Sequence, residues 1–261
     1  RYQMLLPAFA LVLARVAGLI LAVPMLTSTQ VPRMIKVILI AAVSLMIFPL
    51  VINRVPANLT LSTAAVGLLG ELIIGELLGL AAGVVLFASQ LAGQIVSHQA
   101  GMSLGQVLNP LYDEETSILD QVWFFATLVI FLALRGHIAV VEVLLNSFAQ
   151  VPPLGMIVDQ GVVDFVTAML KLCVDMALRL AGPTVLALLL SSLFLGFLTR
   201  TLPQLNIFSV GFSLKIAVAL VMVAVTLTHT DDLIGRGASD AMDQLGLLME
   251  DLSRSAANAV R

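Results

Sequence analysis

Three charged side chains recur at spacing four within one long apolar stretch of the sequence. Lys171, Asp175 and Arg179 occupy positions i, i+4 and i+8, so a helix places them on one face. Asp175 can form an ion pair with either cation, which offsets most of the cost of removing these charges from water. The pattern predicts structural charge pairs within a helix bundle. A proton relay is the alternative, although no second cluster of carboxylates supports it.

A set of uncharged polar side chains follows the same spacing earlier in the chain. Gln90, Gln94 and His98 share one helix face, and Met102 continues the row by one turn. Such a face could line a water-filled lumen, or it could form hydrogen bonds between helices. The spacing by itself leaves both interpretations open.

Small residues form a third pattern in the same stretch. Gly75, Gly79 and Gly83 repeat at spacing four, and the row continues more loosely through Gly93 and Gly101. Small residues on one face allow two helix backbones to approach closely. We therefore predict helix packing here, either within the chain or against a neighbouring subunit.

Signatures of enzymes and metal sites are missing from the sequence. It has no His-Glu-x-x-His motif, no paired aspartates and no glycine-rich phosphate loop. Its single cysteine, Cys173, excludes a disulfide framework and a multi-cysteine metal site. We expect no catalytic residue, no cofactor and no bound metal.

The composition indicates where the chain resides. Of its 261 residues, 60% are hydrophobic and 11% are charged, whereas soluble domains are about 45–50% apolar and about 25% charged. These apolar and charged fractions exclude a soluble globular protein and an intrinsically disordered one. A net charge of −3 without a basic cluster argues against nucleic-acid binding. The chain is expected to be a membrane-associated, all-α protein.

Proline, glycine and polar residues divide the apolar sequence into long helical segments. The segments expected to be helical cover residues 4–23, 34–52, 64–105, 118–134, 138–150, 162–198 and 207–227. A polar, proline-containing break follows the third segment over residues 106–117, and residues 231–261 read as an amphipathic helix. The break could be a short external loop or a re-entrant loop that lines a cavity.

Charges lie inside almost every apolar segment, Arg15, Glu71, Glu76 and Lys215 among them. Each costs roughly 2.5–3.5 kcal/mol at the middle of a lipid-exposed helix. The charged sides of these helices are therefore expected to face protein or water. The two longest segments, of about 40 residues, would extend roughly 60 Å and exceed the hydrocarbon thickness.

Several short motifs follow one another in a fixed order along most of the chain. They are the run His98 to Leu104 with Asn109-Pro110, Arg15-Val16 with Val31-Pro32-Arg33, Phe131 to Leu134 with Gly136-His137, Val151 to Gly155, and Pro203 to Phe208 with Gly211-Phe212. In this order they resemble the FliR family of flagellar export-gate proteins, which is homologous to the T-type subunits of virulence type III secretion. The sequence departs from the family pattern at Ala100 and Asn109, where the family usually has Met and Asp.

The resemblance implies a subunit of a protein-export gate rather than an enzyme. Members of this family assemble with FliP-like and FliQ-like subunits, and with a FlhB-like protein, around a channel for unfolded export substrates. The assembly belongs to the bacterial inner membrane and lies largely on its periplasmic side. The resemblance also implies a P-like part over residues 1–158 and a Q-like helical hairpin over residues 159–261, with residues 201–206 at the hairpin tip.

The resemblance further implies that the polar break is the plug of the family, which closes the channel in the absence of substrate. Its first part consists of Gln106, Val107, Leu108, Asn109, Pro110, Leu111 and Tyr112. The resemblance also favours the lumen interpretation of the Gln90 row. A virulence-type export subunit stays an alternative, as does a small-solute transporter that would use the face of Lys171, Asp175 and Arg179.

Overall fold

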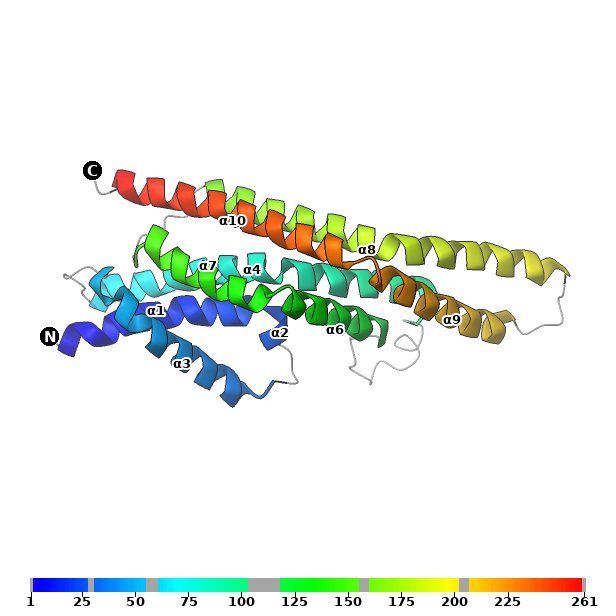
Figure 1. Ribbon diagram of the computed structural model, residues 1–261, viewed down its shortest axis with the longest axis horizontal. Coiled ribbons are helices and arrows are strands. Elements are labelled where there is room, and N and C mark those ends of the chain that lie inside the picture. The colour runs from blue at the N-terminus through cyan, green and yellow to red at the C-terminus, as the bar shows by residue number, and fades with distance from the viewer. Residues whose placement is uncertain are drawn as a thin grey trace. The chain divides into compact units, whose positions relative to one another are not determined.

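The computed structural model describes residues 2–27, 31–54, 61–102, 118–154, 160–201 and 207–259. Within these ranges almost every residue is helical and none belongs to a β-strand, as Figure 1 shows. The all-α expectation is confirmed for this part of the chain. The helices are α1 (Tyr2–Ala22), α2 (Pro24–Thr27), α3 (Arg33–Val51) with the 3-10 turn η1 (Ile52–Arg54), α4 (Leu61–Ala100), α6 (Ile118–Ala133), α7 (Gly136–Gln150), α8 (Gln160–Thr201), α9 (Ile207–Leu227) and α10 (Asp231–Ala259).

These helices form two compact units. Unit 1 contains Arg1–Val84, Arg135–Lys171 and Ala238–Arg261, and unit 2 contains Val85–Leu134 and Leu172–Gly237. The long helices α4, α8 and α10 contribute residues to both units. The predicted division into a P-like part, residues 1–158, and a Q-like part, residues 159–261, rests on family resemblance and not on compactness. It stays a prediction.

Helix α4 ends at a glycine for a local reason. The backbone N–H of Gly101 donates to the carbonyl of His98, and that of Met102 donates to the carbonyl of Ser97, both at 3.1 Å. Gly101 has a φ of 86°, which a residue without a Cβ adopts at little cost. Gly101 thus terminates the helix that carries the other glycines of its row.

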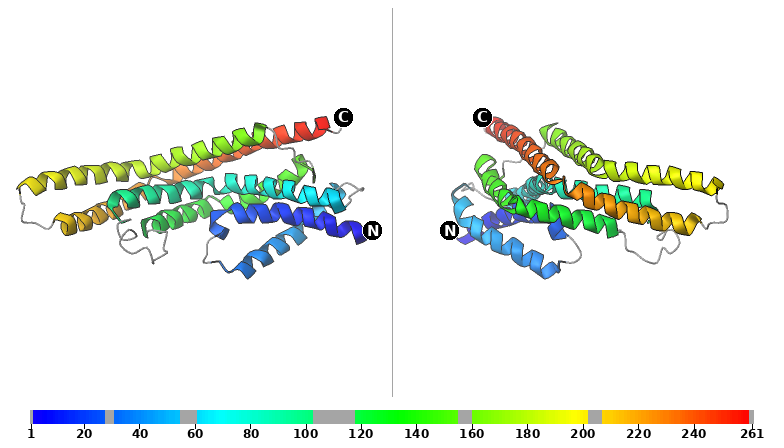
Figure 2. Two further views of the ribbon diagram at one scale, coloured as in Figure 1. Left: turned by 180° about the vertical axis from the view of Figure 1, so that it is seen from behind. Right: turned by 45° about the vertical axis from the view of Figure 1, so that its right-hand side comes forward.

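Glycines bring the backbones of α1 and α4 into direct contact within unit 1. A Cβ atom added at Gly75 would overlap the carbonyl oxygen of Arg15, and one added at Gly18 would overlap that of Leu72. At Gly79 it would lie 2.5 Å from the Cβ of Ala22. Figure 2 shows α1 alongside the first half of α4. Two of the predicted packing glycines, Gly75 and Gly79, therefore face α1.

Four described helices are long and apolar enough to cross a membrane, or up to five if α6 and α7 form one broken span. They differ in how much of their surface the chain itself covers. The most apolar window of α4 is 72% buried, against 28% for α8 and 17% for both α3 and α9. Helix α4 is therefore an internal helix, whereas α3, α8 and α9 present apolar side chains outward.

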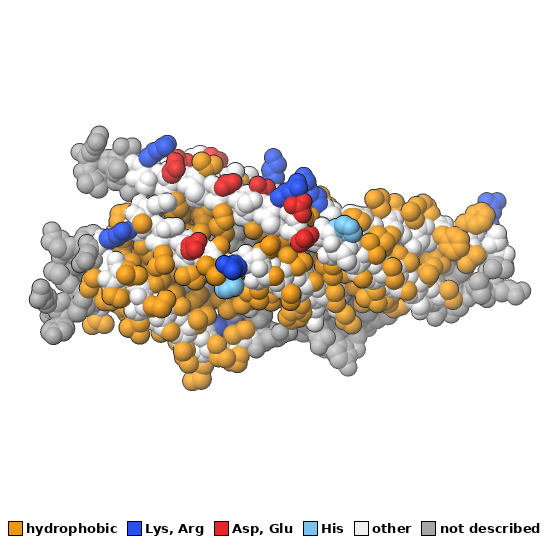
Figure 3. All heavy atoms as spheres, viewed as in Figure 1, with side chains coloured by type: hydrophobic (Ala, Val, Ile, Leu, Met, Phe, Trp, Pro, Cys, Tyr) orange, Lys and Arg blue, Asp and Glu red, His pale blue; other side chains and the backbone are white. Residues whose placement is uncertain are grey.

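Helix α10 has the amphipathic character predicted for the end of the chain. Ile234, Leu245, Leu248 and Leu252 are buried on one face. Charged side chains gather along the other face, and the second half of α8 together with α9 shows a largely hydrophobic surface (Figure 3). The 29 residues of α10 have a polar outer face that suits contact with water.

The close contact of α1 and α4 predicts a difference between two glycine substitutions. Gly75→Ala should destabilise the purified protein by about 1–3 kcal/mol, because the methyl group overlaps the Arg15 backbone. Gly246→Ala, at an α10 position with nothing within 4 Å, should instead gain up to about 1 kcal/mol from helix propensity. Thermal unfolding in detergent, followed by circular dichroism, measures both changes. Equal melting temperatures for the two variants would contradict the close packing.

Candidate functional site

A buried ion pair joins α1 and α4 in unit 1. The Nε of Arg15 donates to Oε2 of Glu71 at 2.5 Å, and both side chains are fully buried. The two residues are 56 positions apart in the sequence. Because each charge neutralises the other, both can lie within apolar helices.

The end of α7 completes this polar cluster. Nη1 of Arg15 donates to the hydroxyl of Ser147 at 3.3 Å and to the carbonyl of Val151 at 3.1 Å. Its guanidinium carbon lies 4.2 Å from the centre of the Phe148 ring, a cation–π contact. One side chain of α1 therefore holds both the last turn of α7 and the residue that follows it.

Glu71 also binds the turn beyond α7. Its Oε1 accepts a hydrogen bond of 3.0 Å from the backbone N–H of Leu154. Leu154 has a φ of 72°, a left-handed conformation that is uncommon for a leucine. The hydrogen bond to a buried carboxylate stabilises this turn. The cluster thus positions the segment that leads toward α8, and its role is structural.

Unit 2 contains a smaller buried contact between α4 and α6. The hydroxyl of Ser97 donates to Oδ1 of Asp120 at 2.9 Å, and both residues are buried. Asp120 lies in the first turn of α6, where the helix dipole favours a negative charge. A Cβ at Gly93 would lie 2.5 Å from the Cα of Asp120. A glycine therefore allows the backbones of these two helices to touch as well.

This contact brings together the two sides of the predicted plug. Ser97 lies in the last turns of α4, and Asp120 lies in the first turn of α6. The predicted plug residues, Gln106 to Tyr112, lie outside the described residues, as does the rest of 106–117. The structure describes the helices on either side of this segment, α4 and α6. The role of the segment as a plug stays a prediction.

The predicted lumen row lies on the outer face of α4 in unit 2. Gln90 is half-buried, and Gln94 and His98 are exposed. Met102 follows the end of the helix and is half-buried. Gly83, from the glycine row, is buried. The polar row is available to line a water-filled space, a function that stays a prediction.

The predicted charge row on α8 lies at the surface of the chain. The Nε of Arg179 lies 2.8 Å from Oδ2 of Asp175, and the two side chains are 64% and 54% exposed. Lys171 is also exposed, and among the described residues no ion pair involves it. In the part of the chain that the structure describes, the buried ion pair is Arg15–Glu71.

The sequence did not predict that Arg15 pairs with Glu71. Both residues stand out as charges inside apolar segments, which is the one signal that could have identified them. Helical spacing relates only residues on the same helix, however, and these two come from different helices. Their pairing is a property of helix packing.

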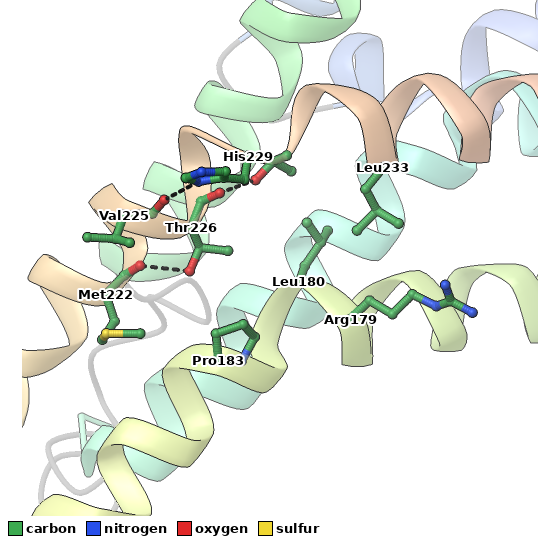
Figure 4. Close-up of a pocket in the computed structure, with 9 residues that line it drawn as sticks. Arg179, Leu180, Pro183, Met222, Val225, Thr226, His229 and Leu233 are labelled. Carbon is green, nitrogen blue, oxygen red and sulfur yellow. Dashed lines mark hydrogen bonds between the residues drawn. The ribbon is translucent and has the colours of Figure 1, made fainter.

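A pocket of about 310 Å³ lies between α8, α9 and the start of α10 in unit 2 (Figure 4). Pro183 has no N–H to donate to the carbonyl of Arg179, so the helix can open beside the pocket. His229 interacts through Nδ1 with the Thr228 hydroxyl at 2.8 Å and the Val225 carbonyl at 3.3 Å. Figure 4 shows the guanidinium of Arg179 pointing away along α8. The pocket walls are mainly apolar and hold no pair of groups arranged for acid–base catalysis.

No group of three metal-binding side chains occurs among the described residues. The described helices instead define a class of protein, a polytopic helical membrane protein with a buried ion pair and large apolar side chains exposed on α3, α8 and α9. The sequence from residue 6 to residue 240 matches the family described as Bacterial export proteins, family 1. The chain therefore belongs to this family, which confirms its resemblance to FliR.

Curated relatives agree with this membership. The chain is 27% identical to the flagellar biosynthetic protein FliR of Bacillus subtilis, with 86% of this chain and 87% of the relative covered. It is 30% identical to FliR of Escherichia coli, with 81% of each chain covered. The surface presentation of antigens protein SpaR of Salmonella typhimurium is 27% identical, with coverages of 84% and 82%. The protein is thus a membrane component of a bacterial export apparatus.

The buried ion pair predicts an unequal response to single and double substitutions. Arg15→Met should cost about 3–5 kcal/mol, because it leaves the Glu71 carboxylate buried without a counter-charge. Combining it with Glu71→Leu should recover part of that loss, since an apolar pair removes the unpaired charge. Thermal unfolding of the purified variants in detergent measures the difference. A double variant no more stable than Arg15→Met would contradict this account.

Proposed function

We propose that the protein is a subunit of the export gate of the flagellar type III secretion apparatus in the bacterial inner membrane. Together with FliP-like and FliQ-like subunits it forms the channel through which unfolded flagellar proteins pass. The observation that carries the proposal is the family match from residue 6 to residue 240, nearly the whole chain. Two relatives named as flagellar biosynthetic proteins, each matched over more than four-fifths of its length, support the flagellar assignment.

The outer surface supports an assembled rather than a solitary protein. Large apolar side chains are exposed on α3, α8 and α9, and Met34, Leu190 and Phe197 are each at least 65% exposed. Contiguous apolar surface is typical of interfaces with protein or lipid. FliP-like, FliQ-like and FlhB-like partners would cover part of this surface. The assembly would lie largely on the periplasmic side.

The second candidate is a subunit of a virulence type III export gate. SpaR favours it, because its identity of 27% equals that of the Bacillus subtilis protein. A small-solute transporter is less well supported. The charge row that it would use contains an exposed, already neutralised Asp175–Arg179 pair.

Within the gate, residues 106–117 would act as the plug. The described contacts on either side of this segment support the assignment, since the Ser97–Asp120 hydrogen bond holds its flanking helices together. Gln90, Gln94 and His98 would line the channel beside it, because this polar row is not buried by the chain.

Co-purification tests the proposed function. The protein, expressed with FliP-like and FliQ-like subunits, should elute from size exclusion as one stable complex with both. The proposal would be wrong if the chain forms no such complex and transports a small solute by itself in lipid vesicles. The same experiment with virulence-type partners separates the two export systems.

Removal of the plug tests its role. Deletion of residues 106–117 should leave assembly with the partners intact and make the inner membrane permeable to small solutes. Efflux of a small dye from vesicles that contain the complex measures the leak. An assembled complex with unchanged permeability would show that this segment does not close the channel.

A further inference from the structure

A single charged residue interrupts the apolar helix α9. Lys215 lies eight residues after Ile207 in a helix of 21 residues, and the other 20 side chains are uncharged. Its side chain is half-buried, with Gly211 and Ala219 buried one turn to either side. Phe212 and Leu214, in contrast, are exposed. Lys215 therefore lies at the edge between the inner face of α9 and its outward apolar face.

The described part of the chain offers Lys215 no counter-charge. In unit 2, Asp120 is buried and bonded to Ser97, and Asp175 pairs with Arg179. Asp232 pairs with Arg236 on α10. No hydrogen bond or ion pair between described residues involves the Lys215 ammonium. The only charge of α9 therefore depends on its surroundings for compensation.

Lipid is a poor environment for this group. The outward side of α9 around it is hydrophobic, and Val210, Leu220 and Val221 are all exposed. Eight residues of helix are about 12 Å, so the ammonium would have to reach well along the axis to pass the nearer end of α9. An ammonium held in hydrocarbon is strongly disfavoured. A protein surface that contributes a carboxylate lowers this penalty.

We propose that Lys215 marks a docking surface for an apolar helix of another subunit, and that this helix contributes an Asp or Glu to pair with it. The proposal rests on the proposed function, which provides the neighbouring subunits. The outward apolar side of α9, with Phe212 and Leu214, forms the rest of the surface. The carboxylate supplies the specificity, because an apolar helix without it would leave Lys215 buried and unpaired.

The chain itself contains an example of the partner chemistry. Glu76 lies within the apolar helix α4, it is exposed, and among the described residues no hydrogen bond or ion pair involves it. The buried Arg15–Glu71 pair shows how two such charges stabilise a contact between helices. In the proposed interface the same chemistry operates between chains.

Substitutions in the co-expressed complex test the docking surface. Lys215→Met keeps the length of the side chain and removes its charge, so the amount of co-purified partner should fall about tenfold or more. Lys215→Glu should have the same effect, whereas Lys215→Arg should retain most of the complex. Lys171→Met is the matched control, because Lys171 is an exposed lysine without an ion pair among the described residues. It should assemble as the unsubstituted protein does.

Zero-length crosslinking identifies the counter-charge directly. Treatment of the purified complex with a carbodiimide should join the Lys215 amine to a carboxylate of another subunit, and peptide mass spectrometry locates the site. The crosslink should disappear in Lys215→Met and persist in Lys171→Met. Equal membrane levels and helical content of all variants show that a loss reflects assembly rather than folding.

The outcomes separate this inference from the proposed function. If the unsubstituted chain binds no partner, both fail. If it assembles and Lys215→Met assembles equally well, the docking surface alone is wrong. A crosslink from Lys215 to a carboxylate of its own chain, or to lipid alone, would likewise overturn it.

Discussion

The ion pair between Arg15 and Glu71 is the contact on which the rest of unit 1 depends. Neither charge could be buried alone, so α1 and α4 must pack with these two positions facing each other. Nη1 of Arg15 then binds the end of α7, and Oε1 of Glu71 binds the turn at Leu154. The need to neutralise two buried charges thus positions three helices that are distant in sequence.

Close backbone approach makes this pairing possible. Gly18 and Gly75 remove the side chains that would otherwise separate α1 from α4 near Arg15. Unit 2 combines the same elements on a smaller scale, because Gly93 lets α6 approach α4 beside the Ser97–Asp120 hydrogen bond. In each unit a glycine provides the contact distance and a buried polar pair provides the specificity of the contact.

Charged and apolar side chains are thus distributed differently between the interior and the surface of the chain. The buried charges of Arg15 and Glu71 pair with each other, whereas many large apolar side chains of α3, α8 and α9 are exposed. A protein of an export apparatus can leave such faces to other subunits or to lipid, since both exclude water. Lys215 belongs to this outer surface, and for that reason its counter-charge is expected from a neighbour.

The sequence by itself determined the all-α class, most helix bounds and the family. Helix α9 begins and ends where the apolar segment does, whereas α4 ends at Ala100 and not at residue 105 as the sequence predicted. Composition, periodicity and helix termination are local properties, so they can be read along the chain. Only the tertiary structure decided that Arg15 pairs with Glu71, that Gly75 faces α1, and that the Asp175–Arg179 pair lies at the surface. These outcomes depend on which helix faces meet, and the spacing of residues within one helix carries no information about its neighbour.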